Sequence, residues 1–235
     1  MFLEINNIDS YYGLSHILFG VSLSVIEGES IFLLGRNGVG KTTTLSSIMG
    51  FVKPRAGSIL FEGKELIGKE PHEIYRLGIS IVPEGRRLFS GCTVRENLQI
   101  AKDFASNLRK GKQINDVLGI FPALTERMNQ DAGTLSGGEQ QMLALGRSII
   151  SDSKLVLLDE PTEGLAPLIK NALSEQILQM KKMGVSIVCA DDKVELAQKM
   201  ADRSYFIEKG QIKWSGTIEE MSKDDVLYQF LGISS

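Results

Sequence analysis

Short apolar runs that end in polar turns are the main repeating pattern along this chain. Residues 30–34 (SIFLL) run into a glycine-rich loop, residues 155–158 (LVLL) run into Asp159 and Glu160, and residues 185–189 (VSIVC) are followed by paired aspartates. Such runs are typical of parallel strands that are buried on both faces. Because ligands gather at the carboxyl ends of parallel strands, the three runs predict one shared site.

The middle of the chain changes to a helical pattern. Apolar residues recur at spacings of three and four over residues 96–104, 113–121 and 139–150. This is the period of amphipathic helices, so a helical insertion is expected between residues 93 and 150.

The N-terminal third carries another pattern. Residues 2–5 alternate in polarity, and residues 58–61 precede Glu62-Gly63, a pair that suits a turn between antiparallel strands. The chain as a whole is therefore predicted to be an α/β protein. We expect a mostly parallel core sheet, an N-terminal antiparallel β layer and a helical subdomain.

Composition narrows the class of protein. The 235 residues are 43% hydrophobic and 23% charged, with a net charge of −3, which is typical of a globular protein and disfavours a nucleic-acid partner. Cys92 and Cys189 have no metal-ligand spacing. No run reaches the roughly 20 apolar residues of a membrane span, and residues 1–13 lack the features of a signal peptide. Any work at a membrane is expected to need a spanning partner.

The glycine-rich loop predicts a phosphate-binding site. It matches the pattern G-x-x-x-x-G-K-[ST], follows a strand and precedes a helix-compatible run over residues 43–50. Backbone N–H groups and the helix N-terminus would surround phosphate oxygens, Lys41 would reach the β- and γ-phosphates, and Thr42 would bind Mg²⁺. A glycine-rich turn without a ligand is the alternative. The candidate residues are Gly35, Arg36, Asn37, Gly38, Val39, Gly40, Lys41, Thr42 and Thr43.

The acidic pair after residues 155–158 predicts the hydrolytic chemistry. Asp159 would hold Mg²⁺ through water, and Glu160 is the candidate general base for the water that attacks the γ-phosphate. An aspartate at a strand end is by itself more often a turn former, but the phosphate loop favours the catalytic interpretation.

A second anion-binding device lies in residues 135–141 (LSGGEQQ). Ser136 can cap the following helix, while Gly137 and Gly138 allow a backbone to approach an anion closely. Glu139 completes the predicted contact set. A plain helix cap is the alternative. Because one nucleotide does not need both devices from one subunit, the pattern predicts ATP held between two subunits.

These motifs resemble those of ATP-binding cassette (ABC) subunits over nearly the full chain. The resemblance implies that Tyr12 stacks on adenine, with Tyr11 as a rival, and that Glu84 occupies the position of a metal-touching glutamine. Residues 162–167 match the loop that crosses the dimer interface. Asp192 falls at the switch position beside the γ-phosphate, and a one-residue shift would choose Asp191 instead.

The subfamily is indicated by PEGRRLF at residues 83–89 and GLAP at residues 164–167. Both are similar to the ATPases of branched-chain amino acid importers, and equally to those of urea and short-chain amide importers. The short C-terminus, with residues 228–232 near its end, fits them too. The resemblance implies two ATPase subunits, identical or paralogous, beneath two membrane permease subunits at the cytoplasmic face of the inner membrane. A solute-binding receptor would deliver the solute.

The same resemblance implies one nucleotide-binding domain over residues 1–235. About residues 1–84 and 151–235 would form the ATP-binding core, and about residues 85–150 the helical subdomain.

Two positions depart from the family pattern. Most relatives have His at the switch position and this subfamily often has Gln, but an ionised Asp192 cannot donate a hydrogen bond and repels phosphate. We hypothesise that this subunit forms the weaker of two ATP sites or uses Asp192 through water, with Lys193 in partial compensation. Glu84 is a good Mg²⁺ ligand. Its neighbours Arg86 and Arg87 would moderate its charge. The arginine pair is either a solvated loop surface or a contact with the cytoplasmic helix of the permease subunit.

Two other functions fit the sequence less well. A non-transport ABC ATPase acting on nucleic acid or the ribosome usually carries two cassettes, coiled-coil insertions or zinc modules, none of which this sequence contains. A subunit that binds ATP but barely hydrolyses it is disfavoured by Lys41, Thr42, Asp159 and Glu160, although Asp192 keeps that alternative open.

Overall fold

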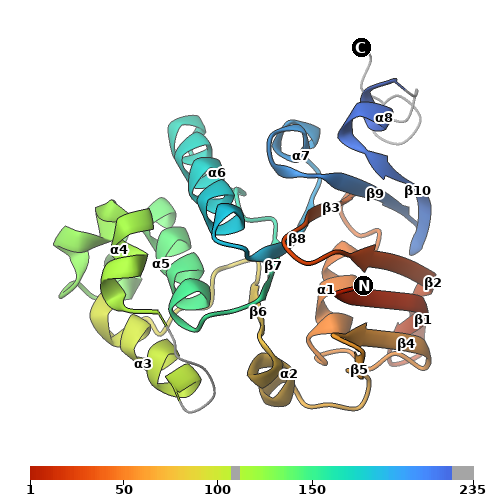
Figure 1. Ribbon diagram of the computed structural model, residues 1–235, viewed down its shortest axis with the longest axis horizontal. Helices are drawn as coiled ribbons and strands as arrows, with labels where there is room; N and C mark the ends of the chain where they lie inside the picture. The colour runs from red at the N-terminus through yellow and green to blue at the C-terminus, as the bar shows by residue number, and fades with distance from the viewer. Residues whose placement is uncertain (107–111, 224–235) are drawn as a thin grey trace.

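The computed structural model describes residues 1–106 and 112–223, so the predicted C-terminal feature at residues 228–232 lies outside the described residues. Figure 1 shows a two-sheet core with a group of helices beside it. Sheet one has the order β2-β1-β4-β5 and is antiparallel. Its strands are β1 (Leu3–Tyr12), β2 (Ser15–Val25), β4 (Ala56–Phe61) and β5 (Lys64–Glu65).

The central sheet has the order β10-β9-β3-β8-β7-β6. All its neighbouring strands run parallel except the pair formed by β9 and β10. This confirms the predicted mostly parallel core. Its strands are β3 (Ser30–Leu34), β6 (Ile79–Val82), β7 (Leu155–Asp159), β8 (Ser186–Asp191), β9 (Arg203–Glu208) and β10 (Gln211–Thr217).

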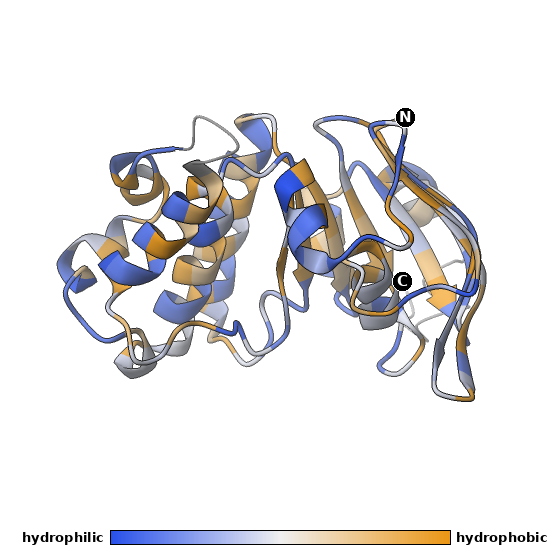
Figure 2. Cartoon of the chain, turned by 90° about the horizontal axis from the view of Figure 1, so that it is seen from below, coloured by the Kyte–Doolittle hydropathy of each residue, from blue (hydrophilic) through white to orange (hydrophobic). Residues whose placement is uncertain are grey.

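Strand β3 shows why its sequence carries no polar alternation. Ile31 and Leu33 pack in the hydrophobic cluster between the two sheets, whereas Phe32 and Leu34 pack on the opposite face toward the helices, and all four are fully buried. Since side chains alternate across a strand, burial on both faces requires an unbroken apolar run. Figure 2 shows the core strands mostly in the hydrophobic colour, while the helices carry both colours.

The helical insertion connects β6 to its parallel neighbour β7. Its main helices are α3 (Val94–Ser106), α4 (Ile114–Ile120) and α5 (Gly137–Ile150), joined by the short 3₁₀ helices η1 (Pro122–Arg127) and η2 (Ala132–Thr134). The three predicted helices are thus present with slightly shifted ends. The remaining helices are α1 (Lys41–Ile48), α2 (Pro71–Leu77), α6 (Pro167–Lys182), α7 (Val194–Met200) and α8 (Ile218–Lys223). Among the described residues, no helix is long and apolar enough to cross a membrane.

Candidate functional site

The ends of three neighbouring strands bring the candidate residues together. β8 lies between β3 and β7, with Leu34 in register with Asp191 and Asp159 in register with Ala190. The phosphate loop after β3 and the acidic pair after β7 therefore flank the aspartates at the end of β8. This is the shared edge that the apolar runs predicted.

Close packing shapes the phosphate loop between β3 and α1. A Cβ atom on Gly35 would lie 2.5 Å from the carbonyl oxygen of Ile207. Gly40, which has a φ of +115°, would place its Cβ 2.7 Å from a methyl group of Leu18. Only glycine fits either position. Gly40 is also the N-cap of α1, and no side chain caps this helix, so its first N–H groups can receive an anion.

Lys41 is buried against the loop that precedes it. Its Nζ donates to the carbonyl oxygens of Gly35 at 2.8 Å and Arg36 at 3.2 Å, and to Asn37 Oδ1 at 3.3 Å. It also lies 3.4 Å from Glu160 Oε1, in an ion pair whose side chains are only 4% and 12% exposed. The phosphate loop and the candidate base are thus in direct contact.

Asp159 meets the phosphate loop through a hydrogen bond, because Thr42 Oγ1 donates to its Oδ1 at 3.1 Å. Its burial raises the pKa of Asp159 to about 6, opposed by the Thr42 hydrogen bond and reinforced by the carboxylates of Glu160 and Glu84. A hydroxyl oxygen beside carboxylates that repel one another is a donor set that suits a hard divalent cation. Within the described residues, no group of three His, Cys, Asp or Glu side chains is already clustered as a metal site.

Glu160 adopts an unusual backbone conformation at the turn after β7. Its φ is +47°, and its N–H donates to the carbonyl oxygen of Ala190 at 2.9 Å. A residue with a side chain rarely takes this conformation unless the surroundings impose it. Burial raises the pKa of Glu160, as does the nearby Glu163, while Lys41 opposes them. A raised pKa brings a carboxylate closer to the range that suits a general base.

A cavity of about 360 Å³ contains most of these groups. It joins the phosphate loop to Tyr12, Glu84 and Glu160. Two of its residues, Ile17 and Glu163, were not singled out from the sequence, although Glu163 lies in the predicted interface loop. The lining residues are Tyr12, Ile17, Asn37, Gly38, Gly40, Lys41, Thr42, Thr43, Glu84, Glu160 and Glu163.

The two neighbouring tyrosines have different surroundings. Tyr11 stacks on His16, with ring centres 4.1 Å apart, and the guanidinium of Arg55 lies 4.1 Å from its ring centre. Tyr12 is 52% exposed and lines the cavity. The geometry therefore favours Tyr12 over Tyr11 for stacking on a base.

The Ser-Gly-Gly turn lies outside this cavity, at the start of α5. Ser136 and Glu139 form a capping box, in which Ser136 Oγ donates to Glu139 Oε2 at 2.7 Å. Arg127 Nε donates to the same carboxylate at 2.8 Å, and this bond, followed by the bond from Ser136, lowers the pKa of Glu139. Gly138 packs against α6, where a Cβ atom would lie 2.6 Å from Ile169. Among the described residues, this turn and the phosphate loop therefore do not line the same cavity.

The aspartates after β8 also differ from each other. Asp191 is fully buried, and its Oδ1 accepts the N–H groups of Asp192 at 2.8 Å and Lys193 at 3.0 Å. The side chain of Asp192 is 43% exposed, and the residue is not among those that line the cavity. Lys193 Nζ lies 3.6 Å from a carboxylate oxygen of each aspartate. Burial lowers the pKa of Lys193, but the two aspartates outweigh it and the net pKa is raised.

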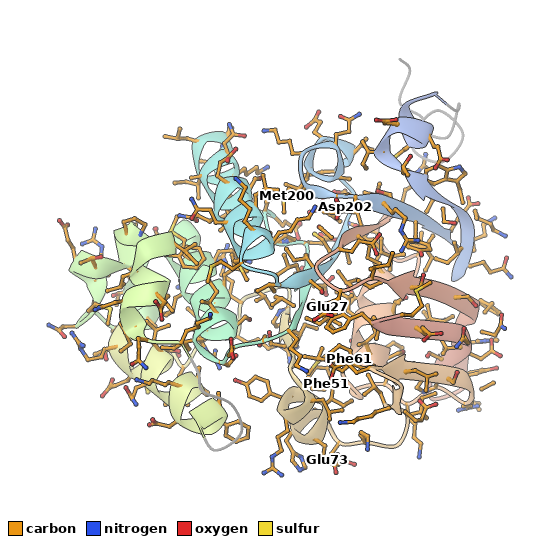
Figure 3. The ribbon with its side chains drawn as sticks, viewed as in Figure 1. Glu27, Phe51, Phe61, Glu73, Met200 and Asp202 are labelled. Carbon is orange, nitrogen blue, oxygen red and sulfur yellow. The ribbon has the colours of Figure 1, made fainter. Side chains whose placement is uncertain are left out.

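A larger groove of about 550 Å³ lies between the core and the helical insertion. Its apolar lining includes the exposed rings of Phe51, Phe89 and Phe104. Phe51 is labelled in Figure 3, near α2. Arg86, which also lines the groove, donates to Gln140 Oε1 at 3.1 Å and Gln141 Oε1 at 3.2 Å. The loop after β6 is thus tied to the start of α5.

Fold and site together define a phosphate-loop ATPase. The model of the ABC transporter family matches residues 18–163, and the chain belongs to that family. It is 45% identical over 210 residues to "High-affinity branched-chain amino acid transport ATP-binding protein BraG" of Pseudomonas aeruginosa, covering 89% of this chain and 90% of that protein. It is 33% identical to "Probable branched-chain amino acid transport ATP-binding protein LivF" of Archaeoglobus fulgidus, covering 88% of each.

Solved structures agree with this assignment. A crystal structure of the ADP conformation of an ATP-binding cassette of an ABC transporter has a TM-score of 0.85 to this chain. The two are 28% identical, and the match covers 98% of this chain and 97% of the other. The resemblance inferred from the motifs is confirmed, and the chain is an ATP-binding, ATP-hydrolysing cassette of the ABC transporter family.

Proposed function

We propose that this chain is the energy-coupling ATPase of an importer for branched-chain amino acids. The solute class is supported by the 45% identity to BraG and the 33% identity to LivF, each over nearly nine tenths of the chain. The proposed chemistry is supported above all by the ion pair between Lys41 and Glu160, which puts the phosphate-binding lysine beside the candidate base.

The proposed roles follow from the cavity. Tyr12 stacks on adenine, the N–H groups from Gly35 to Thr43 surround the phosphates, and Lys41 neutralises charge on the β- and γ-phosphates. Glu160 accepts a proton from the attacking water. Thr42, Asp159 and Glu84 are the residues that would hold Mg²⁺, which supplies charge neutralisation to the phosphoryl group when bound.

The Ser-Gly-Gly turn in residues 135–141 is proposed to bind the ATP held by a partner cassette. Ser136, Gly137, Gly138 and Glu139 lie outside the cavity that contains Lys41, which supports a role in contacting a nucleotide on a second cassette. In this arrangement, about residues 1–84 and 151–235 are assigned to the ATP-binding core and about residues 85–150 to the helical subdomain that presents the turn. Residues 107–111 and 224–235 of these ranges lie outside the part of the chain that the structure describes. The second cassette is a paralogue or a second copy of this chain.

The groove between core and helices is the proposed contact with the permease subunits. Its exposed aromatic rings offer an apolar surface, and Arg86 and Arg87 add positive charge beside it. Docking there would hold the chain at the cytoplasmic face of the inner membrane, beneath two permease subunits that receive solute from a receptor. A nucleic-acid partner is not proposed, since the net charge is −3.

Glu160→Gln tests the proposed chemistry. We expect ATP hydrolysis by the chain, assembled with its permease and second cassette, to fall at least about a hundredfold while ATP binding is retained, because the amide keeps the shape but cannot accept the proton. Glu195→Gln, at an exposed position of α7, is the matched control. Unchanged hydrolysis in Glu160→Gln would contradict the role of Glu160 and favour a mainly structural, ATP-binding subunit.

A further inference from the structure

The nucleotide site has a marked excess of negative side chains. Glu84, Glu160 and Glu163 line the cavity, and Asp159 lies beside them. Among the described residues that line this cavity, Lys41 is the only one with a positively charged side chain. A nucleoside triphosphate adds further negative charge, and like charges at a few ångströms in a partly buried site are costly.

Lys193 is well placed to supply a second positive charge. It follows β8, the strand between the phosphate loop and the acidic pair, because Leu34 is the register neighbour of Asp191 and Asp159 that of Ala190. Its side chain is about one third exposed. Lys193 is not among the residues that line the cavity, but it follows the strand end that the cavity adjoins, and its ammonium group is near enough to Glu160 for the two charges to attract each other.

The two aspartates hold Lys193 with different strengths. Asp191 is fixed, because it is fully buried and accepts two backbone N–H groups, and within the described residues its Oδ2 has no hydrogen-bond partner. Asp192 is 43% exposed, and its contact with Lys193 is 3.6 Å long. An exposed ion pair of this kind is worth little, so the flexible lysine can leave Asp192 at small cost.

We propose that Lys193 binds the γ-phosphate of ATP and supplies, as a full positive charge, the contact that the aspartate before it cannot make. Asp191 is the positioning residue that keeps the stem of Lys193 at the end of β8. Asp192 is the exposed partner of Lys193 when no nucleotide is bound. This inference rests on the proposed function, since it assumes that ATP occupies the cavity of Lys41 and Glu160.

The test compares affinities for ATP and ADP, which differ only in the γ-phosphate. All variants carry Glu160→Gln, so that ATP is not consumed, and fluorescent ATP and ADP analogues are titrated into the purified chain. We expect Lys193→Met to lower the ratio of ATP to ADP affinity about tenfold, the size of one charge contact at a partly hydrated site. Lys193→Arg should keep the ratio within about threefold of the parent, because the charge remains.

Lys199→Met is the matched control, because Lys199 lies on α7, the helix that begins directly after Lys193, and its Nζ donates to Asn171 Oδ1 instead. An unchanged ratio in Lys193→Met, equal to that of the control, would overturn the inference. Equal losses of ATP and ADP affinity would overturn it as well, since they would show a structural role. If Lys193→Met does not fold, Lys193→Gln takes its place under the same criteria. Full hydrolysis in the Glu160→Gln parent would instead refute the proposed function.

Discussion

Replacing Asp159 with Asn should make the nucleotide-free protein more stable. Asp159 is 3% exposed, and its surroundings raise its pKa from 3.8 to about 6. At neutral pH the folded protein must therefore keep a carboxylate ionised in a place that disfavours it, at a cost of about 3 kcal/mol relative to the unfolded chain. Asn removes that charge and can still accept the hydrogen bond from Thr42.

The sign of the pH dependence follows from the raised pKa. Near pH 4 the carboxyl is largely protonated in the fold, and the advantage of Asn is only about 0.5 kcal/mol. As pH rises through 6, the wild type pays the full ionisation cost, so the advantage grows to about 3 kcal/mol at pH 7.5. For a chain of this size that corresponds to about 6–12 °C in melting temperature.

Urea unfolding of both proteins between pH 4 and pH 7.5, in EDTA and without nucleotide, measures this difference. Glu208→Gln, at an exposed position at the end of β9, is the control and should show no comparable trend. Asp159→Asn should also lose Mg²⁺-dependent ATP hydrolysis, as expected when a group that strains the fold serves function. If the variant is less stable at pH 7.5, or if its advantage does not grow with pH, the explanation from burial is wrong.

Three further predictions concern the rest of the site. Tyr12→Ala should weaken ATP binding about tenfold through lost stacking, whereas Tyr11→Ala should not, as measured with a fluorescent nucleotide; equal effects would contradict the assignment. Gly138→Ala should lower the free energy of unfolding by about 1–3 kcal/mol, because a methyl group there would lie 2.6 Å from a side chain of α6. Gly119→Ala, on a helix position with open space, should instead be neutral or stabilising by up to about 1 kcal/mol, and thermal melts distinguish the two. Asp192→His or Asp192→Gln should raise ATP turnover of the assembled transporter, and the idea that Asp192 limits hydrolysis fails if neither does.

The central strands could be predicted because strands that are buried on both faces require continuous apolar runs, which are visible in the sequence. Residues 31–34 and 155–158 are unbroken apolar runs, and the structure places them in β3 and β7. β10 was not predicted, since it lies at the edge of its sheet and its residues are exposed or only partly buried. The pairing of β2 with β1 contains register shifts, so a regular alternation of polar and apolar residues does not predict β2.

The site was predictable where a sequence motif directly follows a strand. It was less predictable where the orientation of a side chain depends on neighbouring strands. The sequence leaves Asp191 and Asp192 interchangeable at the end of β8. In the structure Asp191 is buried at the end of β8 and Asp192 is exposed, a difference that depends on tertiary structure. The groove of about 550 Å³ could not be inferred either, because its walls combine residues such as Phe51 and Arg147, which are distant in sequence and belong to no common motif.

The contact between Lys41 and Glu160 makes the two halves of the reaction mutually dependent. At 3.4 Å each group is the counter-ion of the other, so the carboxylate is least basic while the ammonium stays beside it. A triphosphate that draws Lys41 away leaves Glu160 more basic than before. Binding of ATP is therefore expected to increase the basicity of the residue that activates the attacking water. Without ATP, the ion pair with Lys41 keeps Glu160 a weaker base.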